Sequence, residues 1–206
     1  RRLDGLSLAI ELAAARVAGL PPATLLERLS DRFRLLVGHG QTRSARHRTL
    51  RTALDWSYDL LSEAERQVVS RLSVFAGGCT LEAAEAVVRD VVPQDAVLDV
   101  LARLVDKCLV LVSDSPRGTI RYGLLDTLRA YGEEHLGVAG LDEARRRHAR
   151  FFRALAEQAA PALAGPDPGA WSERLEVEHE NLRAAILWAV ANQPETALHM
   201  VVALGP

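Results

Sequence analysis

The chain has 206 residues, with 25 basic and 27 acidic side chains and a formal net charge of −2. Because 49% of the residues are apolar, the composition is that of a globular protein with a buried core and excludes a disordered chain. The near-zero charge gives no general attraction to nucleic acid or to an anionic membrane, and no apolar run approaches the roughly 18 residues that a membrane-spanning helix needs. We therefore expect a cytoplasmic protein without a membrane partner.

Helical periodicity dominates the first part of the chain. The pattern predicts helices over 6–18 and 22–37, separated by the breaker Gly-Leu-Pro-Pro at 19–22, and then a polar, basic loop over 38–48. A helix over 49–61 follows, and its spacing places Trp56 and either Leu60 or Leu61 toward the core. Cys79 and Cys108 are expected to be reduced, buried thiols, because a single pair makes no disulfide framework.

The middle of the chain combines three helices with a hairpin. A helix that starts after Ser62 ends before Gly77-Gly78, Thr80 caps a short helix that runs to about residue 88, and Pro93 starts another. The spacing in this last helix places Val97, Leu98, Leu101, Leu104 and Val105 toward the core. Residues 108–125 then form two short β-prone runs around a turn at 113–118, and a helix over 124–136 follows. This order predicts a winged-helix domain over 49–137.

The last part of the chain is helical again. A short hinge is expected at Gly137 to Gly140, and helices are expected over about 141–161, 171–192 and 194–204. Helical hairpins of this kind stack in superhelical repeats. The fold class is therefore mainly α with one small β-hairpin, and residues 138–206 begin a helical array like that of tetratricopeptide repeats.

The residues give no evidence for catalysis or for a metal. None of the six histidines has the spacing of a metal-binding pair, and no nucleophile motif is present, so catalytic and metal sites are predicted to be absent. Lys107 is the one lysine and has no glycine near it, which excludes a phosphate-binding P-loop in this chain. His148 and His179 are predicted to pack on apolar helix faces. The basic run at 145–153 can face the acidic run at 173–180 if their helices are antiparallel.

DNA binding is the main alternative, because winged helices often read the major groove. The recognition helix would be about 94–107, where three aspartates oppose Arg103 and Lys107. The wing tip carries Asp114 beside Arg117 and Arg121. A phosphate-reading face needs concentrated positive charge, which disfavours this alternative without removing it. The basic loop with Arg43, Arg46 and Arg48 is a candidate for phosphate contacts, although a solvated linker explains it equally simply.

Four stretches resemble the regulatory half of bacterial STAND-class ATPases, which are related in architecture to NB-ARC proteins. These stretches are LDGLSLAIELAAARV at 3–17, the long run from Arg48 to Val87, RYGLLDTLRAYGEEHL at 121–136 and the helices from Arg145 onward. The resemblance implies that residues 1–48 are the last helices of an ATPase-associated lid domain. It also implies that the winged helix packs on an ATPase core and that the helical array senses an inducer or protein partner.

Two nucleotide contacts of that family can be placed on this sequence. The family's Gly-x-Pro motif matches Gly5, Leu6 and Ser7, so a serine stands at the position of the adenine-contacting proline. The family's Met-His-Asp motif matches residues 124–126, where Leu125 replaces the phosphate-binding histidine and Asp126 is kept. A leucine cannot donate a hydrogen bond to phosphate, whereas Asp126 can also cap the helix that follows. The resemblance therefore gives Gly5, Ser7 and Asp126 as nucleotide-contact candidates.

The function expected from these observations is regulatory and non-catalytic. The chain is expected to be a segment of a transcriptional regulator that couples the nucleotide state of an ATPase to ligand sensing. No cofactor is expected in the segment itself, and ATP or ADP is expected in the parent protein. DNA would be bound through another domain of the parent.

Overall fold

The computed structural model describes residues 44–115, 118–166 and 168–205, with side chains from Arg51 onward except that of Ala53. The chain divides into two compact units, one of residues 1–62 and 125–128 and the other of residues 63–124 and 129–206. The helices expected over 6–18 and 22–37 lie outside the described residues. None of the helices in the described ranges combines the length and the apolar character that crossing a membrane requires.

The described part of the first unit is mostly the helix α4, Ser44–Asp59. The prediction of a loop up to residue 48 is wrong from Ser44 onward, because alanine and arginine in this stretch are good helix formers and no breaker separates them from 49–59. Trp56 was expected to face the core, but it is 67% exposed. One of Leu60 and Leu61 was also expected there, which is confirmed for Leu61, since it is buried while Leu60 is 61% exposed. Trp56 and Leu60 lie four residues apart on one face.

In the second unit, three helices come first: α5, Glu63–Leu72, α6, Leu81–Val88, and α7, Gln94–Asp106. Each contacts the other two. The Thr80 hydroxyl accepts a hydrogen bond from the backbone N–H of Ala83 at 3.3 Å, which confirms the predicted cap of α6. Pro93 directly precedes α7, as predicted. The buried stripe of α7 is Val97, Val100, Leu101 and Leu104, while Leu98, which was expected inside, is 48% exposed because it lies beside this stripe.

The predicted hairpin is confirmed as β1, Leu111–Asp114, and β2, Ile120–Gly123, paired antiparallel with Val112 opposite Tyr122. Cys79 adds one bridge to the other edge of β2 through two backbone hydrogen bonds with Tyr122, of 2.7 and 2.8 Å. Cys79 is fully buried, and burial raises the pKa of its thiol well above the usual range. Cys108 is exposed and follows the end of α7, so the expectation that both thiols are buried holds only for Cys79.

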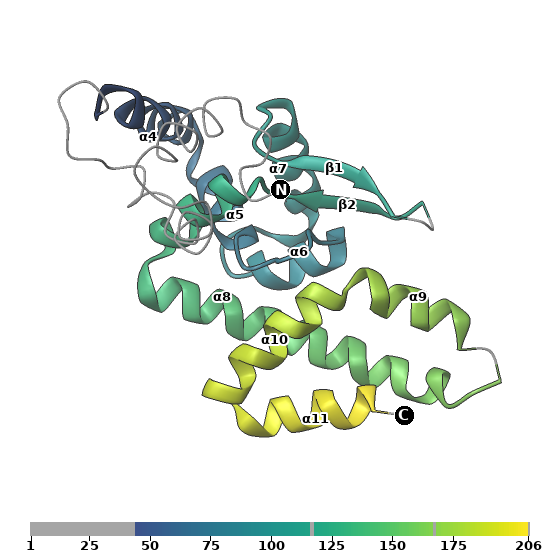
Figure 1. Ribbon diagram of the computed structural model, residues 1–206. Helices are drawn as coiled ribbons and strands as arrows, with labels where there is room; N and C mark the ends of the chain where they lie inside the picture. The colour runs from purple at the N-terminus through teal and green to yellow at the C-terminus, as the bar shows by residue number, and fades with distance from the viewer. Residues whose placement is uncertain (1–43, 116–117, 167, 206) are drawn as a thin grey trace, which may run out of the picture. The chain divides into compact units, whose positions relative to one another are not determined.

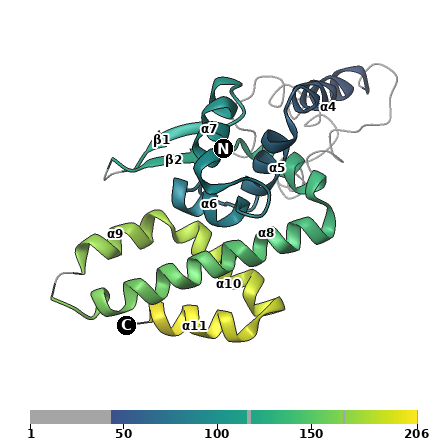
Figure 2. The same cartoon turned by 180° about the vertical axis from the view of Figure 1, so that it is seen from behind.

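The remaining helices are α8, Asp126–Leu163, α9, Gly169–Val177, α10, His179–Asn192, and α11, Pro194–Leu204. Gly137 has φ 61° and kinks α8 where the hinge was expected. Figure 1 shows α9, α10 and α11 beside the part of α8 that follows the kink, and Figure 2 shows the same arrangement from behind. The single helix predicted over 171–192 is broken at Glu178, between α9 and α10.

The buried apolar residues of the second unit form two groups. The group among α5–α7 and the hairpin consists mainly of β-branched and leucine side chains, and the group among α8, α10 and α11 consists mainly of alanines. Small residues let the backbones of α10 and α11 approach closely, as in stacked helical hairpins. The second group includes Ala149, Phe152, Ala156, Ala159, Leu182, Ala185, Ala189 and Met200.

A ring cluster joins the two groups. Phe75, in the segment after α5, lies 5.0 Å from His148 and 6.4 Å from Phe152 between ring centroids. His148 is 3% exposed, as expected, whereas His179 is exposed, so the prediction that both pack on apolar faces is wrong for His179. Burial lowers the pKa of His148 to about 4, although Asn181 faces the ring and opposes this shift. His148 is therefore neutral in the folded protein at pH 7.

We predict that this histidine makes the fold sensitive to mild acid. The unfolded chain protonates His148 near pH 6.5 and the folded chain near pH 4, so stability is lost as the pH falls through this window. The cost at pH 5 is about 2 kcal/mol relative to pH 8. Urea unfolding between these pH values measures it. The variant His148→Phe should flatten the dependence and His179→Gln should not; an equal slope in all three proteins would contradict the prediction.

Candidate functional site

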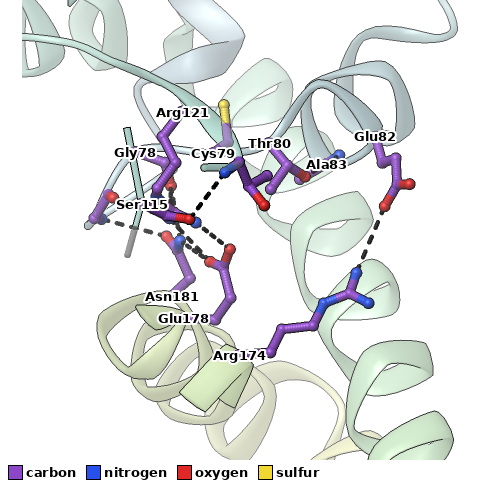
Figure 3. Close-up of polar contacts among 12 residues, drawn as sticks. Gly78, Cys79, Thr80, Glu82, Ala83, Ser115, Arg121, Arg174, Glu178 and Asn181 are labelled. Carbon is purple, nitrogen blue, oxygen red and sulfur yellow. Dashed lines mark hydrogen bonds and ion pairs between the residues drawn. The ribbon is translucent and has the colours of Figure 1, made fainter. Parts of the chain in front are cut away.

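A group of hydrogen-bonded polar residues connects the hairpin to the start of α10 in the second unit. We call it the Arg121 cluster: the side chains of Arg121, Glu178 and Asn181 with the backbone of Ala76, Gly77 and Gly78. Arg121, Glu178 and Asn181 are 8%, 5% and 0% exposed. Figure 3 shows Glu178 and Asn181 pointing toward Arg121 across the space between the helices and the hairpin.

Arg121 uses both terminal nitrogens in this cluster. One nitrogen, Nη1, donates to Oε1 of Glu178, and the other, Nη2, lies 3.2 Å from Oε2 of the same carboxylate. Nη2 also donates to the backbone carbonyls of Gly77 and Gly78 at 3.1 and 3.0 Å. A buried guanidinium with a paired carboxylate and two carbonyl acceptors is satisfied, which is the condition for burying such a charge at all.

Asn181 completes the cluster from the same helix turn. Its amide nitrogen donates to the Gly78 carbonyl at 2.8 Å and to Oε2 of Glu178 at 2.7 Å. Its amide oxygen accepts from the backbone N–H of Ala76 at 2.9 Å. Because Glu178 and Asn181 lie three residues apart, both face the hairpin at the start of α10. The Asn181 side chain thus fixes the positions of both the segment after α5 and the Glu178 carboxylate.

The backbone near Gly78 allows this close approach. Gly78 has φ +70°, and a Cβ atom at this position would lie 2.8 Å from the backbone oxygen of Tyr122. A side chain there would both strain the backbone and push β2 away. The break between α9 and α10 also allows the approach. The chain turns at Glu178, and the Glu178 carboxylate is directed to Arg121.

The positive charges of α7 are also engaged within the protein. Lys107 Nζ lies 2.8 Å from one carboxylate oxygen of Glu65, and Arg103 Nε lies 3.5 Å from the other. Glu65 belongs to α5 and is 2% exposed. The side chains of Arg103 and Lys107 remain 53% and 39% exposed, but their charge is balanced by this carboxylate. The aspartates of α7 therefore dominate its surface charge.

Ion pairs on α8 connect it to the winged-helix part. Asp90, just after α6, lies 3.1 Å from Arg71 Nη2 and 3.0 Å from Arg147 Nη1. Arg147 also pairs with Glu143 at 2.6 Å, and hydrogen bonds from Arg146 and Arg147 hold the pKa of Glu143 below its usual range. The basic run of α8 could face the acidic run at 173–180 if their helices were antiparallel. The ion pairs of Arg145, Arg146, Arg147 and Arg153 instead lie within α8 and at Asp90.

A groove of about 830 Å³ lies next to the Arg121 cluster. Its walls come from the hairpin, the start of α6, Leu98 of α7 and the exposed side of α9. Arg174 of α9 reaches across it, 3.5 Å from Glu82 of α6, with its guanidinium carbon 5.1 Å from the Trp171 ring centroid. The hairpin, α6 and α9 are thus held together on both sides of the groove.

The site residues predicted from the sequence are only partly described. Gly5, Ser7 and Arg43 lie outside the described residues, and Arg46 and Arg48 lie in the first part of α4, before Arg51, where only the backbone is described. Asp126 is the first residue of α8. The nucleotide and phosphate contacts therefore stay predictions. In the part of the chain that the structure describes, no group of three or more potential metal-ligating side chains is found.

Sequence reasoning missed the Arg121 cluster, since it considered Arg121 only as a charge of the wing tip in the DNA-binding alternative. The available signal was an arginine between the apolar Ile120 and Tyr122 of a predicted strand, together with Glu178 and Asn181 at helical spacing.

Comparison with known proteins agrees with the class of fold. Residues 61–137 match the family described as "Winged helix-turn-helix domain". This range contains α5, α6, α7, the hairpin and the start of α8, so the chain contains a winged-helix domain. No solved structure matches the chain.

Relatives extend over the whole chain. A Mycobacterium tuberculosis protein named "Putative HTH-type transcriptional regulator Rv0890c" is 43% identical over 209 aligned residues, covering 100% of this chain and 23% of that protein. A Mycobacterium bovis protein of the same description, Mb0914c, matches to the same extent. The M. tuberculosis protein named "Uncharacterized protein Rv0894" is 44% identical over 142 residues, 68% of this chain and 36% of that protein. The chain thus spans about a quarter of the length of the two regulators.

We predict that Arg121 and Glu178 are strongly coupled in stability. Removing either partner leaves a buried, uncompensated charge, so Arg121→Ala and Glu178→Ala should each lower the free energy of unfolding by about 3 kcal/mol. The double variant should lose clearly less than the sum, with a coupling of about 2 kcal/mol in urea unfolding.

The pair Glu180 and Arg183 on α10 is a matched control. Oε2 of Glu180 lies 3.8 Å from Nη1 of Arg183, and the two side chains are 59% and 65% exposed. The corresponding coupling should be about 0.5 kcal/mol or less. Additive losses at Arg121 and Glu178 would show that the buried pair does not act as a unit.

Proposed function

We propose that this chain is a non-catalytic regulatory segment of a STAND-class signal-transduction ATPase that regulates transcription. In this proposal the winged helix is a docking surface for protein and the helices after Gly137 begin a tetratricopeptide-like array. The observation that carries the proposal is the buried Arg121 cluster, because a wing arginine that holds a helical layer is unavailable to DNA phosphate. The descriptions of the relatives support a role in a transcriptional regulator.

The charges of α7 support the same proposal. A helix that reads DNA needs cations free to meet phosphates, and Arg103 and Lys107 are paired with Glu65. The exposed Trp56 of α4 and the exposed Leu60 just after this helix favour contact with another protein surface. We propose the parent's ATP- or ADP-bound core as that partner, an inducer or protein partner at the helical array, and DNA binding by another domain.

The direct test is binding of this chain to the separately produced ATPase core of its parent protein. We expect an affinity that differs by about fivefold or more between the ADP-bound and the ATP-bound core, because a nucleotide switch requires differential affinity for the two states. Isothermal titration calorimetry measures both affinities. The variant Trp56→Ser should weaken binding, whereas Leu187→Ser, at an exposed apolar residue of α10, is the matched control. Equal affinity in both nucleotide states would overturn the proposal.

The alternative function is DNA binding by this winged helix, which the match to a winged helix-turn-helix family favours. We predict no binding in fluorescence anisotropy with a labelled duplex of about 25 base pairs at about 20 mM salt, because the cations of α7 and β2 are paired internally. An established winged-helix DNA-binding domain serves as the positive control. Submicromolar binding that weakens steeply at about 200 mM salt would instead establish the alternative.

A further inference from the structure

The groove beside the Arg121 cluster has the size and the lining of a small-molecule site. Its volume of about 830 Å³ falls in the usual range for ligand pockets. Two of the large apolar side chains that line it are strongly exposed, Leu98 at 48% and Ile120 at 51%. Val177 of α9 adds a third apolar side chain opposite the hairpin. A ligand with an apolar body would remove this surface from water.

The charges around the groove select the sign of the ligand. Four carboxylates line it, from Glu82, Glu173, Glu176 and Glu178, against two guanidiniums, from Arg121 and Arg174.

Both guanidiniums already have partners within the protein. Arg121 is bonded to Glu178 and to two backbone carbonyls, and Arg174 lies between Glu82 and the Trp171 ring. Glu176, in contrast, projects an exposed carboxylate from α9 at the groove. The field in the groove is therefore negative, and it attracts positive charge.

We propose that this groove binds a small organic cation with an apolar body, such as an aromatic or aliphatic amine. The apolar body contacts Leu98, Ile120 and Val177, and the ammonium group pairs with Glu176. Because the walls come from both the hairpin and α9, an occupant bridges them and stabilises the docked position of the wing. The effect on the docked wing rests on the proposed regulatory function, whereas binding of the cation to the groove does not.

The probe is dansylcadaverine, which joins an apolar fluorescent ring to a primary ammonium group. We expect saturable binding to the whole chain, with blue-shifted emission and an affinity at least about tenfold higher than that of dansylglycine, which carries the same ring and a carboxylate. Glu176→Arg should weaken binding about tenfold and Leu98→Gln about fivefold. The matched controls Glu195→Arg and Leu198→Gln change exposed residues of α11 outside the groove and should leave the affinity unchanged.

Several outcomes would overturn the proposal. These are no binding, equal affinity for the anionic probe, or affinities that do not respond to Glu176→Arg and Leu98→Gln in variants that keep the circular dichroism spectrum of the folded chain. Tight binding of a basic apolar peptide, with no binding of the amine, would assign the groove to a protein partner instead.

Amide hydrogen exchange at residues 120–123 should slow when the amine binds, and unchanged exchange would overturn the link to the wing. None of these outcomes changes the result expected for binding to the ATPase core, so the two proposals are tested separately.

Discussion

The second unit depends on one buried ion pair, between Arg121 of the wing and Glu178 at the break before α10. Removing these charges from water costs several kcal/mol per ion, and the cost is offset only when every polar atom finds a partner. Asn181 and the carbonyls of Gly77 and Gly78 supply those partners. The pair therefore requires the hairpin, the segment after α5 and the start of α10 to meet in one arrangement.

This requirement changes what the winged helix can do. In a winged helix that reads DNA, the wing and the recognition helix carry cations that meet phosphates. Here the wing cation at Arg121 is buried, and Glu65 balances two cations of α7 from within the protein. The same architecture thus has its positive charge turned toward its own helices.

Local patterns predicted most of the second unit, because its elements have strong local signals. Thr80 and Pro93 mark helix starts, and the change to a period of two marks the hairpin, so these elements agree with the structure. The break at Glu178 has no proline or glycine to mark it, and Glu178 there contacts Arg121, a partner that no local pattern contains. The Arg121 cluster was missed for the same reason, since its partners are 57 residues apart.

The errors in predicted burial have a common physical cause. Periodicity places a residue on a helix face, but whether that face is covered depends on the neighbours that pack against it. Leu98 lies beside the covered stripe of α7, and His179 lies on α10 just beyond the buried Glu178. His148 and His179 have similar local sequence signals, and only His148 has aromatic rings packed against it.

A buried ion pair is also a suitable element for a switch. Its two states differ sharply, because the pair is either fully satisfied or broken with a charge left to be solvated, and intermediate positions are unfavourable. Small changes in the free energy of docking can therefore change the population of the state in which the hairpin is docked on α10. A ligand in the adjoining groove would bias the same equilibrium, because it contacts the hairpin and α9 together and gains that contact only while the wing is docked.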